Sequence, residues 1–504
     1  MPYNDLLNSL GFESDPFAKT NADEEEKLDQ YFVAPPFFNA ILGDPSAPKS
    51  SLVFGPRGGG KTAMKRKIEL SSQKHGFLCL TYNQFDIVGR RLSDIDSEYH
   101  LRNLVEMLLI GIITAVSDSG INHLSHEDRH FLYLFVKEHL SKIDQTKLKL
   151  DINAIKNRSE KAEELWNKFI GPIGLVLNAL LERIGLGTAE IKRFQDEGGQ
   201  LGTLTDQLVT LQAISAKLGY PSVYFLIDRV DENPLTGAAA GETYSFIAPL
   251  ITDLQLLETP GFAFKFFLWD LLLDDYRRVA RPDRIKYYIL EWKHDQLAQM
   301  LSERLKAYSN GRVSSLQEIS DARLPIPLDQ AVAICAQESP RNVVRICKEI
   351  LDQQSEIDSR AKRISEDAVR LGFNRVAENI TNELFSDTII KELQKTHRCD
   401  FTIRYIYSDI FKFTQPAALN KVHTWENAGA IRQLGSIQES RGRKPSNHYG
   451  IAHILLAKHI FSTIPISEFI RDKTRVCPGC KRVLVRDWDL RSPQQCNFCQ
   501  NEVR

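Results

Sequence analysis

Short apolar runs, each bounded by polar or glycine-rich segments, recur along the first 300 residues of the chain. They lie at residues 50–54, 77–83, 222–228, 262–270 and 286–292. These runs consist mostly of apolar residues and do not alternate with polar ones, which is typical of strands that are buried on both faces of a parallel sheet. The pattern therefore predicts an α/β fold built on a parallel sheet.

A long segment of helical character separates the second run from the third. It contains the stretches LRNLVEMLLIGIITAVSD and AEELWNKFIGPIGLVLNALLERI. We expect a helical insertion at about residues 84–220 inside the sheet domain. The longest apolar runs, residues 108–116 and 171–181, are shorter than the roughly 20 residues that a membrane-spanning helix requires. No association with a membrane is expected.

Chain length indicates the number of domains, and the charged residues are unevenly distributed along the chain. A chain of 504 residues with 42% hydrophobic and 26% charged residues is typical of a soluble protein of roughly three domains. The N-terminus lacks a secretory signal, so we expect a cytoplasmic protein. Residues 400–504 hold 16 Lys and Arg against 9 Asp and Glu, a net charge of +7. This excess fits either an anionic partner or an ordinary solvated surface.

Glycine is concentrated directly behind the first apolar run. Residues 55–62 read GPRGGGKT, and a helical pattern follows. This strand–loop–helix context fits a P-loop, whose backbone N–H groups hold phosphate oxygens and which therefore excludes bulky side chains. Lys61 would reach the β- and γ-phosphates of ATP, and the Thr62 hydroxyl would hold Mg²⁺. The predicted nucleotide-binding residues of this loop are Gly55, Pro56, Arg57, Gly58, Gly59, Gly60, Lys61, Thr62 and Ala63.

Acidic residues follow the third apolar run. Asp228 ends that run, in a position to complete the Mg²⁺ shell, and Asp231 and Glu232 come just after it. Either Asp231 or Glu232 would polarise the attacking water. Which acid acts as the base stays open, because Arg229 stands where many such enzymes carry a glutamate.

With these motifs, residues 12–375 resemble the AAA+ superclass of P-loop ATPases, especially its initiator-like (origin-recognition) and STAND/KAP-like branches. The resemblance implies an ATPase core at residues 50–310 and a helical lid at 311–384. It also implies an N-terminal arm, residues 1–49, that contacts the adenine through Pro16 and Phe17 of the DPF sequence. An ordinary N-terminal arm is the alternative.

The resemblance further implies two arginine roles and a sensor-1 position. Arg281 or Arg284, before the last apolar run, would act as a finger on the nucleotide of a neighbouring subunit in a homo-oligomer. Ordinary surface arginines are the alternative. Arg341, at the start of a predicted helix, matches the sensor-2 position of the lid. Asp270, which ends the fourth run, matches the sensor-1 position, where Asn or Thr is more usual.

The pattern changes in the C-terminal part. Residues 385–465 suggest a winged helix, with a helix ending near Leu434, a strand at 436–440 and a returning strand at 448–455. The turn between these strands carries Arg441, Arg443 and Lys444, which would contact phosphates of double-stranded DNA. A winged helix that contacts a protein is the competing interpretation.

The last residues contain two CxxC pairs. Cys477 and Cys480 are separated by fifteen residues from Cys496 and Cys499. Four thiolates at this spacing are typical of a closed tetrahedral Zn²⁺ site, and a reducing compartment disfavours disulfides. We expect a zinc ribbon at residues 472–504.

Together these features predict an ATP-driven switch that oligomerises and engages DNA or a partner protein. Bacterial and phage proteins with this arrangement include initiators, transposition regulators and antiviral-defence ATPases. The sequence carries no nuclease, deaminase or TIR-like motif, so effector chemistry would belong to a separate protein. The alternative is a scaffold that binds ATP without hydrolysing it. A metabolic nucleotide kinase is excluded, because it has no use for the two C-terminal modules.

Overall fold

The computed structural model describes residues 2–156, 158–170, 176–438, 444–488, 495–496 and 498–503. The chain divides into two compact units. The first, called here the sheet unit, is Ala34–Leu290, and the second, called the lid unit, combines Met1–Val33 with Glu291–Arg504. Each unit is described by itself.

A parallel sheet forms the centre of the sheet unit. Among the described residues it has five strands in the order β2-β3-β4-β1-β5, and every neighbouring pair is parallel. The strands are β1 (Ser51–Gly55), β2 (Leu78–Tyr82), β3 (Val223–Ile227), β4 (Phe262–Trp269) and β5 (Tyr287–Ile289). The residues of β1, β2 and β3 are all buried, as expected for strands covered on both faces. The predicted α/β class is confirmed.

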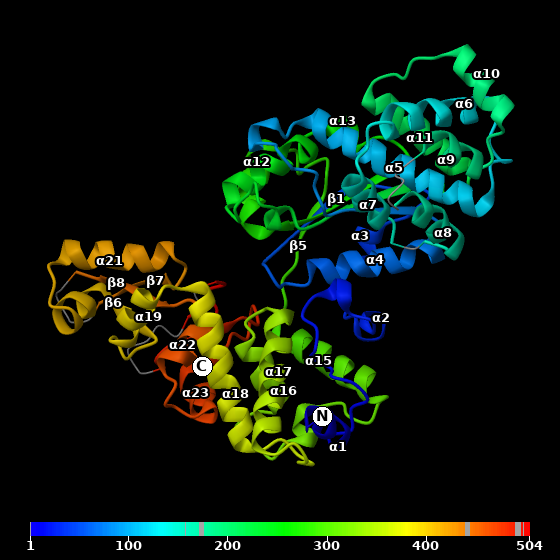
Figure 1. Ribbon diagram of the computed structural model, residues 1–504. Coiled ribbons are helices and arrows are strands. Elements are labelled where there is room, and N and C mark those ends of the chain that lie inside the picture. The colour runs from blue at the N-terminus through cyan, green and yellow to red at the C-terminus, as the bar shows by residue number, and fades with distance from the viewer. Residues whose placement is uncertain are drawn as a thin grey trace. The chain divides into compact units, whose positions relative to one another are not determined.

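Helices flank the sheet and fill the long connection between β2 and β3. Outside that connection they are α3 (Phe38–Leu42), α4 (Lys61–His75), α12 (Ala240–Ile251), α13 (Leu254–Leu257) and α14 (Leu273–Val279). The connection itself holds α5 (Ser97–Ser119), α6 (His126–Phe135), α7 (Gln145–Ala154), α8 (Glu160–Phe169), α9 (Leu177–Arg183), α10 (Thr188–Glu197) and α11 (Leu204–Lys217). Figure 1 shows these last helices gathered into one group beside the sheet.

Helix α5 is the core of this helical group. It packs against α7, α8, α11 and β2. Within the described part of the chain, α5 is also the one helix that is long and apolar enough to cross a membrane. However, 78% of its most apolar window is buried inside the protein, where it contributes to the main hydrophobic core.

The lid unit begins with helices from both ends of its sequence. They are α1 (Pro2–Ser9), α2 (Leu28–Tyr31), α15 (His294–Ser309), α16 (Leu328–Cys335), α17 (Pro340–Ile357) and α18 (Glu366–Leu384). A buried ion pair between Arg304 of α15 and Glu25 fixes the N-terminal arm to this helix. The Arg304 guanidinium also donates to the Tyr31 hydroxyl at 2.6 Å.

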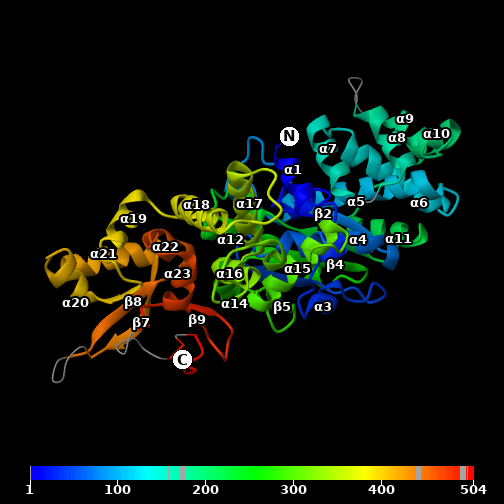
Figure 2. The same cartoon turned by 90° about the horizontal axis from the view of Figure 1, so that it is seen from below.

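The C-terminal part of the lid unit mixes short helices and strands. It contains α19 (Asp387–Gln394), β6 (Asp400–Thr402), α20 (Ile403–Tyr405), α21 (Gln415–Asn427), β7 (Ile431–Ile437), β8 (Ser446–Ile451), α22 (Ile454–Ile460), α23 (Ile466–Lys473), β9 (Thr474–Val476) and β10 (Val483–Val485). In the described residues β6, β8 and β7 form a three-stranded antiparallel sheet, and β9 pairs with β10. Figure 2 shows β7 and β8 side by side as a hairpin.

Two expected boundaries in this part were wrong. The helix that was expected to end near Leu434 ends at Asn427, and Leu434 lies in β7. Gly429 adopts a φ of +73°, and the N–H of Ala430 bonds back to the carbonyl of Trp425, a geometry that terminates helices. The returning strand also ends early, at Ile451, because residues Ile454–Ile460 form α22.

Candidate nucleotide-binding site and metal centre

The glycine-rich loop connects the end of β1 to the start of α4. Gly58 and Gly60 have φ values of +73° and +94°, which favour residues without a side chain. A Cβ atom on Gly59 would lie 2.9 Å from the carbonyl oxygen of Pro56, closer than any side chain tolerates. Each of these glycines is therefore required by the path of the loop.

Lys61 is the first residue of α4, and its side chain folds back over the loop. Its ammonium donates to the carbonyl oxygens of Gly55 at 2.7 Å and of Pro56 at 2.9 Å. The residue is 9% exposed. A buried positive charge is thus held against the loop. The N–H groups of the first turn of α4, which include that of Ala63, also favour an anion at this end of the helix.

Thr62 and Asp228 join the loop to the end of β3. The Thr62 hydroxyl donates to a carboxylate oxygen of Asp228 at 3.0 Å, and Asp228 is 2% exposed. Two oxygen ligands on adjacent corners of an octahedral Mg²⁺ site, each about 2.1 Å from the ion, are separated by about 3 Å. The hydroxyl and the carboxylate therefore fit the ligand set of this ion.

The next two acids lie in different environments. Asp231 is buried and accepts hydrogen bonds from Arg57 of the loop, at 2.7 Å to its carboxylate and 3.3 Å to its carbonyl oxygen. The side chain of Glu232 is 59% exposed and lies 3.8 Å from Arg229. Arg229 itself has a φ of +59°, a left-handed conformation that is uncommon for a residue with a side chain.

Trp269 completes this cluster and was not expected from the sequence. The Arg57 guanidinium lies 4.3 Å from the centroid of the Trp269 ring, at the end of β4. A planar guanidinium stacked on an aromatic ring and paired with a carboxylate is held in one orientation. Arg57, predicted only as a loop position, thus connects the loop to both β4 and the acid-bearing turn. Asp270 follows Trp269 directly and begins a short 3₁₀ turn.

Amide substitutions can distinguish the roles of Asp231 and Glu232. We expect Glu232→Gln to retain ATP binding and to lower phosphate release by at least about 100-fold, the usual contribution of a general base. Asp231→Asn should instead loosen Arg57, since the ion pair is lost, and should weaken ATP binding. Phosphate release and equilibrium ATP binding measure the two effects. If Asp231→Asn traps bound ATP and Glu232→Gln does not, the base is Asp231.

Arg281 and Arg284 lie between α14 and β5. Arg281 pairs with Asp283 at 2.8 Å, and Arg284 pairs with Glu258. Their side chains are 57% and 48% exposed, so both are available to a second molecule. The predicted finger arginines are therefore surface residues with local acidic partners.

The remaining predicted residues belong to the lid unit. Phe17 is buried, and the carbonyl oxygen of Pro16 accepts a hydrogen bond from Arg304. Arg341 is exposed in the first turn of α17, whose N-cap is Ser339. Arg441 and Arg443 lie outside the described residues, and Lys444 is exposed shortly before β8.

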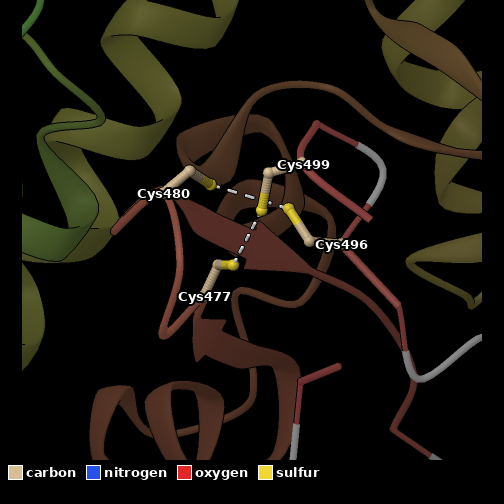
Figure 3. Close-up of side chains that lie close together, drawn as sticks. All are labelled: Cys477, Cys480, Cys496 and Cys499. Carbon is tan, nitrogen blue, oxygen red and sulfur yellow. Dashed lines mark hydrogen bonds between the residues drawn. The ribbon is translucent and has the colours of Figure 1, made fainter. Parts of the chain in front are cut away.

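Four cysteines converge at the C-terminal end of the lid unit. The sulfurs of Cys477, Cys480, Cys496 and Cys499 all lie within 4.8 Å of one another, and they point toward a common centre (Figure 3). The sulfur–sulfur distances are 3.5 Å for Cys477 to Cys499 and 3.6 Å for Cys480 to Cys496.

These distances fit a metal and exclude disulfides. A disulfide requires about 2.05 Å. Four thiolates at about 2.3 Å from a tetrahedral Zn²⁺ would be about 3.8 Å apart, close to the observed values. The cysteines sit on two backbone turns, in which the N–H of Lys481 bonds to the carbonyl of Cys477 and that of Gln500 to the carbonyl of Cys496. The cluster can hold Zn²⁺ with no coordination position left open.

Comparisons with known proteins include a distant structural likeness. No protein-family model matches the sequence, and no curated protein matches it. The structure is similar to that of the Aeropyrum pernix ORC2 protein in ADPNP–ADP complexes, at 12% sequence identity and a TM-score of 0.38. The match covers 88% of this chain and 98% of that chain. The likeness is too distant to assign a family or a function.

Proposed function

We propose that this protein is an AAA+-like ATPase that binds ATP with Mg²⁺ and hydrolyses it to ADP and phosphate. The observation that carries the proposal is the 3.0 Å contact between the Thr62 hydroxyl and Asp228 at the mouth of the glycine loop. A P-loop NTPase holds its metal ion with this pair of groups, a hydroxyl from the loop and a carboxylate from the end of another strand of the sheet.

The residues of the site then have separate roles. The loop N–H groups bind the β-phosphate, and the Lys61 ammonium carries the positive charge toward the β- and γ-phosphates. Thr62 and Asp228 hold Mg²⁺, which neutralises charge on the phosphates when it is bound. Glu232 orients the attacking water, because Asp231 is already engaged by Arg57.

We also propose that hydrolysis is completed in a homo-oligomer. The exposed Arg281 or Arg284 of one subunit would reach the γ-phosphate held by its neighbour, and Arg341 would sense the same nucleotide. Proteins that use a finger arginine gain about 10³–10⁵ in rate from it. The direct test is phosphate release and oligomeric mass of the purified protein, with and without duplex DNA.

The proposed partner of the C-terminal part is double-stranded DNA, in a setting such as antiviral defence or the control of replicating elements. The described elements follow one another in the order α19, β6, α20, α21, β7 and β8, and the three strands form one antiparallel sheet, which fits a winged helix. The net charge of +7 over residues 400–504 suits the DNA backbone.

A triple substitution tests the DNA contact. Changing Arg441, Arg443 and Lys444 to alanine should flatten the log–log salt dependence of DNA binding by roughly 2–3 units, since each neutralised phosphate contributes about 0.9. ATP turnover without DNA should stay unchanged. The matched control removes three exposed lysines of the helical insertion, Lys161, Lys168 and Lys192, and should leave the slope as it is. An unaltered slope in the first variant would make the module a protein-docking surface, with a separate effector protein as its partner.

A non-hydrolysing scaffold is the second candidate function. The observation that favours it is the chain's Arg229, in left-handed backbone, at the position where many ATPases carry a glutamate. A scaffold would bind ATP and recruit an effector through the zinc ribbon without releasing phosphate. Measurable phosphate release that requires Lys61 excludes this alternative.

A further inference from the structure

The turn that joins α16 to α17 has a strained backbone. Gln337 and Glu338 are consecutive residues with side chains, yet their φ values are +47° and +64°. Residues other than glycine adopt this conformation at a cost in free energy, and they keep it only where the surrounding structure holds them. The turn leads directly into Ser339, the N-cap of α17, and into Arg341.

Contacts from the segment between β8 and α22 and from the first residue of α22 hold the first of these residues. The Gln337 side-chain amide donates to the carbonyl of Ala452 at 2.8 Å, and its oxygen accepts from the N–H of Ile454 at 2.7 Å. Ile454 is the first residue of α22, and the preceding His453 makes no side-chain cap. Gln337 therefore caps a helix that begins more than a hundred residues later in the chain.

The zinc ribbon holds the second residue. Arg482, two residues after the metal ligand Cys480, lies 3.5 Å from the Glu338 carboxylate and 2.9 Å from that of Glu291. Burial raises the pKa of Glu338, and the positive charge of Arg482 opposes that effect. The ring of Phe498 lies 4.5 Å from the same guanidinium. The ribbon thus contacts the strained turn through one oriented arginine.

We propose that Gln337 and Glu338 are positioning residues through which the C-terminal modules set the placement of Arg341. This inference rests on the proposed role of Arg341 as a sensor of ATP. The two modules stabilise a turn conformation that the backbone disfavours, so a movement of either module on binding DNA removes that support. The backbone at Gln337 and Glu338 then relaxes, and the start of helix α17, which carries Arg341, shifts with it. A turn with two such states would couple the proposed DNA site to the proposed ATP site, and each ligand would change the affinity for the other by the same factor.

Gln337→Gly in the full-length chain tests the proposal. Glycine accepts a positive φ without strain, so the fold is kept while both hydrogen bonds to the C-terminal module are lost. The matched control is Gln353→Ala, because the Gln353 side chain bonds only within α17, to Glu349 at 3.2 Å, among the described contacts. Two quantities are measured. One is the ratio of ATP affinities with and without duplex DNA, and the other is amide hydrogen exchange over residues 341–344.

We expect the wild-type affinity ratio to differ from one by about fivefold or more, a typical allosteric coupling. In Gln337→Gly the ratio should approach one and the amides should exchange about tenfold faster, whereas the control should match the wild type within about twofold. A wild-type ratio of one, or a variant that keeps the wild-type ratio and exchange rate, overturns the coupling. If the wild type binds no ATP, the proposed function fails. The exchange rates then still decide whether the C-terminal modules hold the turn.

Discussion

Replacement of Lys61 by alanine is expected to abolish ATP hydrolysis. The lysine ammonium donates hydrogen bonds to the carbonyl oxygens of residues 55 and 56, so its positive charge lies against the loop. There it would face the β- and γ-phosphates of ATP. Loss of a preorganised electrostatic contact of this kind costs about 10²–10³ in rate. ATP binding should weaken as well, because the phosphates lose a point charge. Phosphate release under saturating ATP, together with equilibrium binding of a labelled nucleotide, measures both effects.

The control for this variant lies on the same helix. Lys74 is exposed in the last turn of α4, and Lys74→Ala removes an equal charge without touching the loop. Its turnover should equal that of the wild type. Lys61→Arg should behave like Lys61→Ala, since a planar guanidinium does not fit the compact space of an ammonium. Turnover in Lys61→Ala at the wild-type rate would remove the assignment of the loop as a phosphate site.

The sheet and the glycine loop could be predicted because their signals are local. Strands buried on both faces produce continuous apolar runs, and the loop glycines follow from backbone conformations that side chains forbid. The end of α21 also had a local signal, Gly429, that the expected boundary near Leu434 overlooked. A glycine just after a helical pattern commonly ends the helix.

Contacts between distant parts of the chain had no such signal. Arg57 and Asp231 are 174 residues apart in sequence. Their ion pair, and the contact of Arg57 with the Trp269 ring, form only because the order of the strands brings these residues together. Gln337 caps the start of α22, three residues after the end of β8, and no local pattern around Ile454 indicates this contact. The attachment of the N-terminal arm to α15 likewise rests on a buried pair, Arg304 and Glu25, and the whole sheet unit lies between these two residues in sequence.

Loss of one zinc ligand should have the largest effect on stability. Among the described residues, the fully buried core of the ribbon consists of Cys477, Leu484, Cys496 and Val503, so it buries very little apolar surface. The metal must then supply most of the folding free energy, about 10–16 kcal/mol in comparable zinc peptides. We expect Cys496→Ser to lose the bound zinc and to unfold the ribbon, as measured by metal content and by hydrogen exchange in β9 and β10.

The damage should reach beyond the ribbon in one defined place. Asp487 accepts a hydrogen bond from the N–H of Cys399 at 2.8 Å and donates its own N–H to Asp400 at 2.6 Å, which fixes the ribbon to β6. The amides of β6 should therefore exchange faster in Cys496→Ser, while those of the parallel sheet in the sheet unit should not change. Cys335→Ala, at a fully buried cysteine outside the cluster, is the control and should retain one zinc per chain. Retention of zinc with wild-type affinity in Cys496→Ser would contradict the four-cysteine site, because three thiolates leave a tetrahedral ion open to solvent and more easily removed by a chelator.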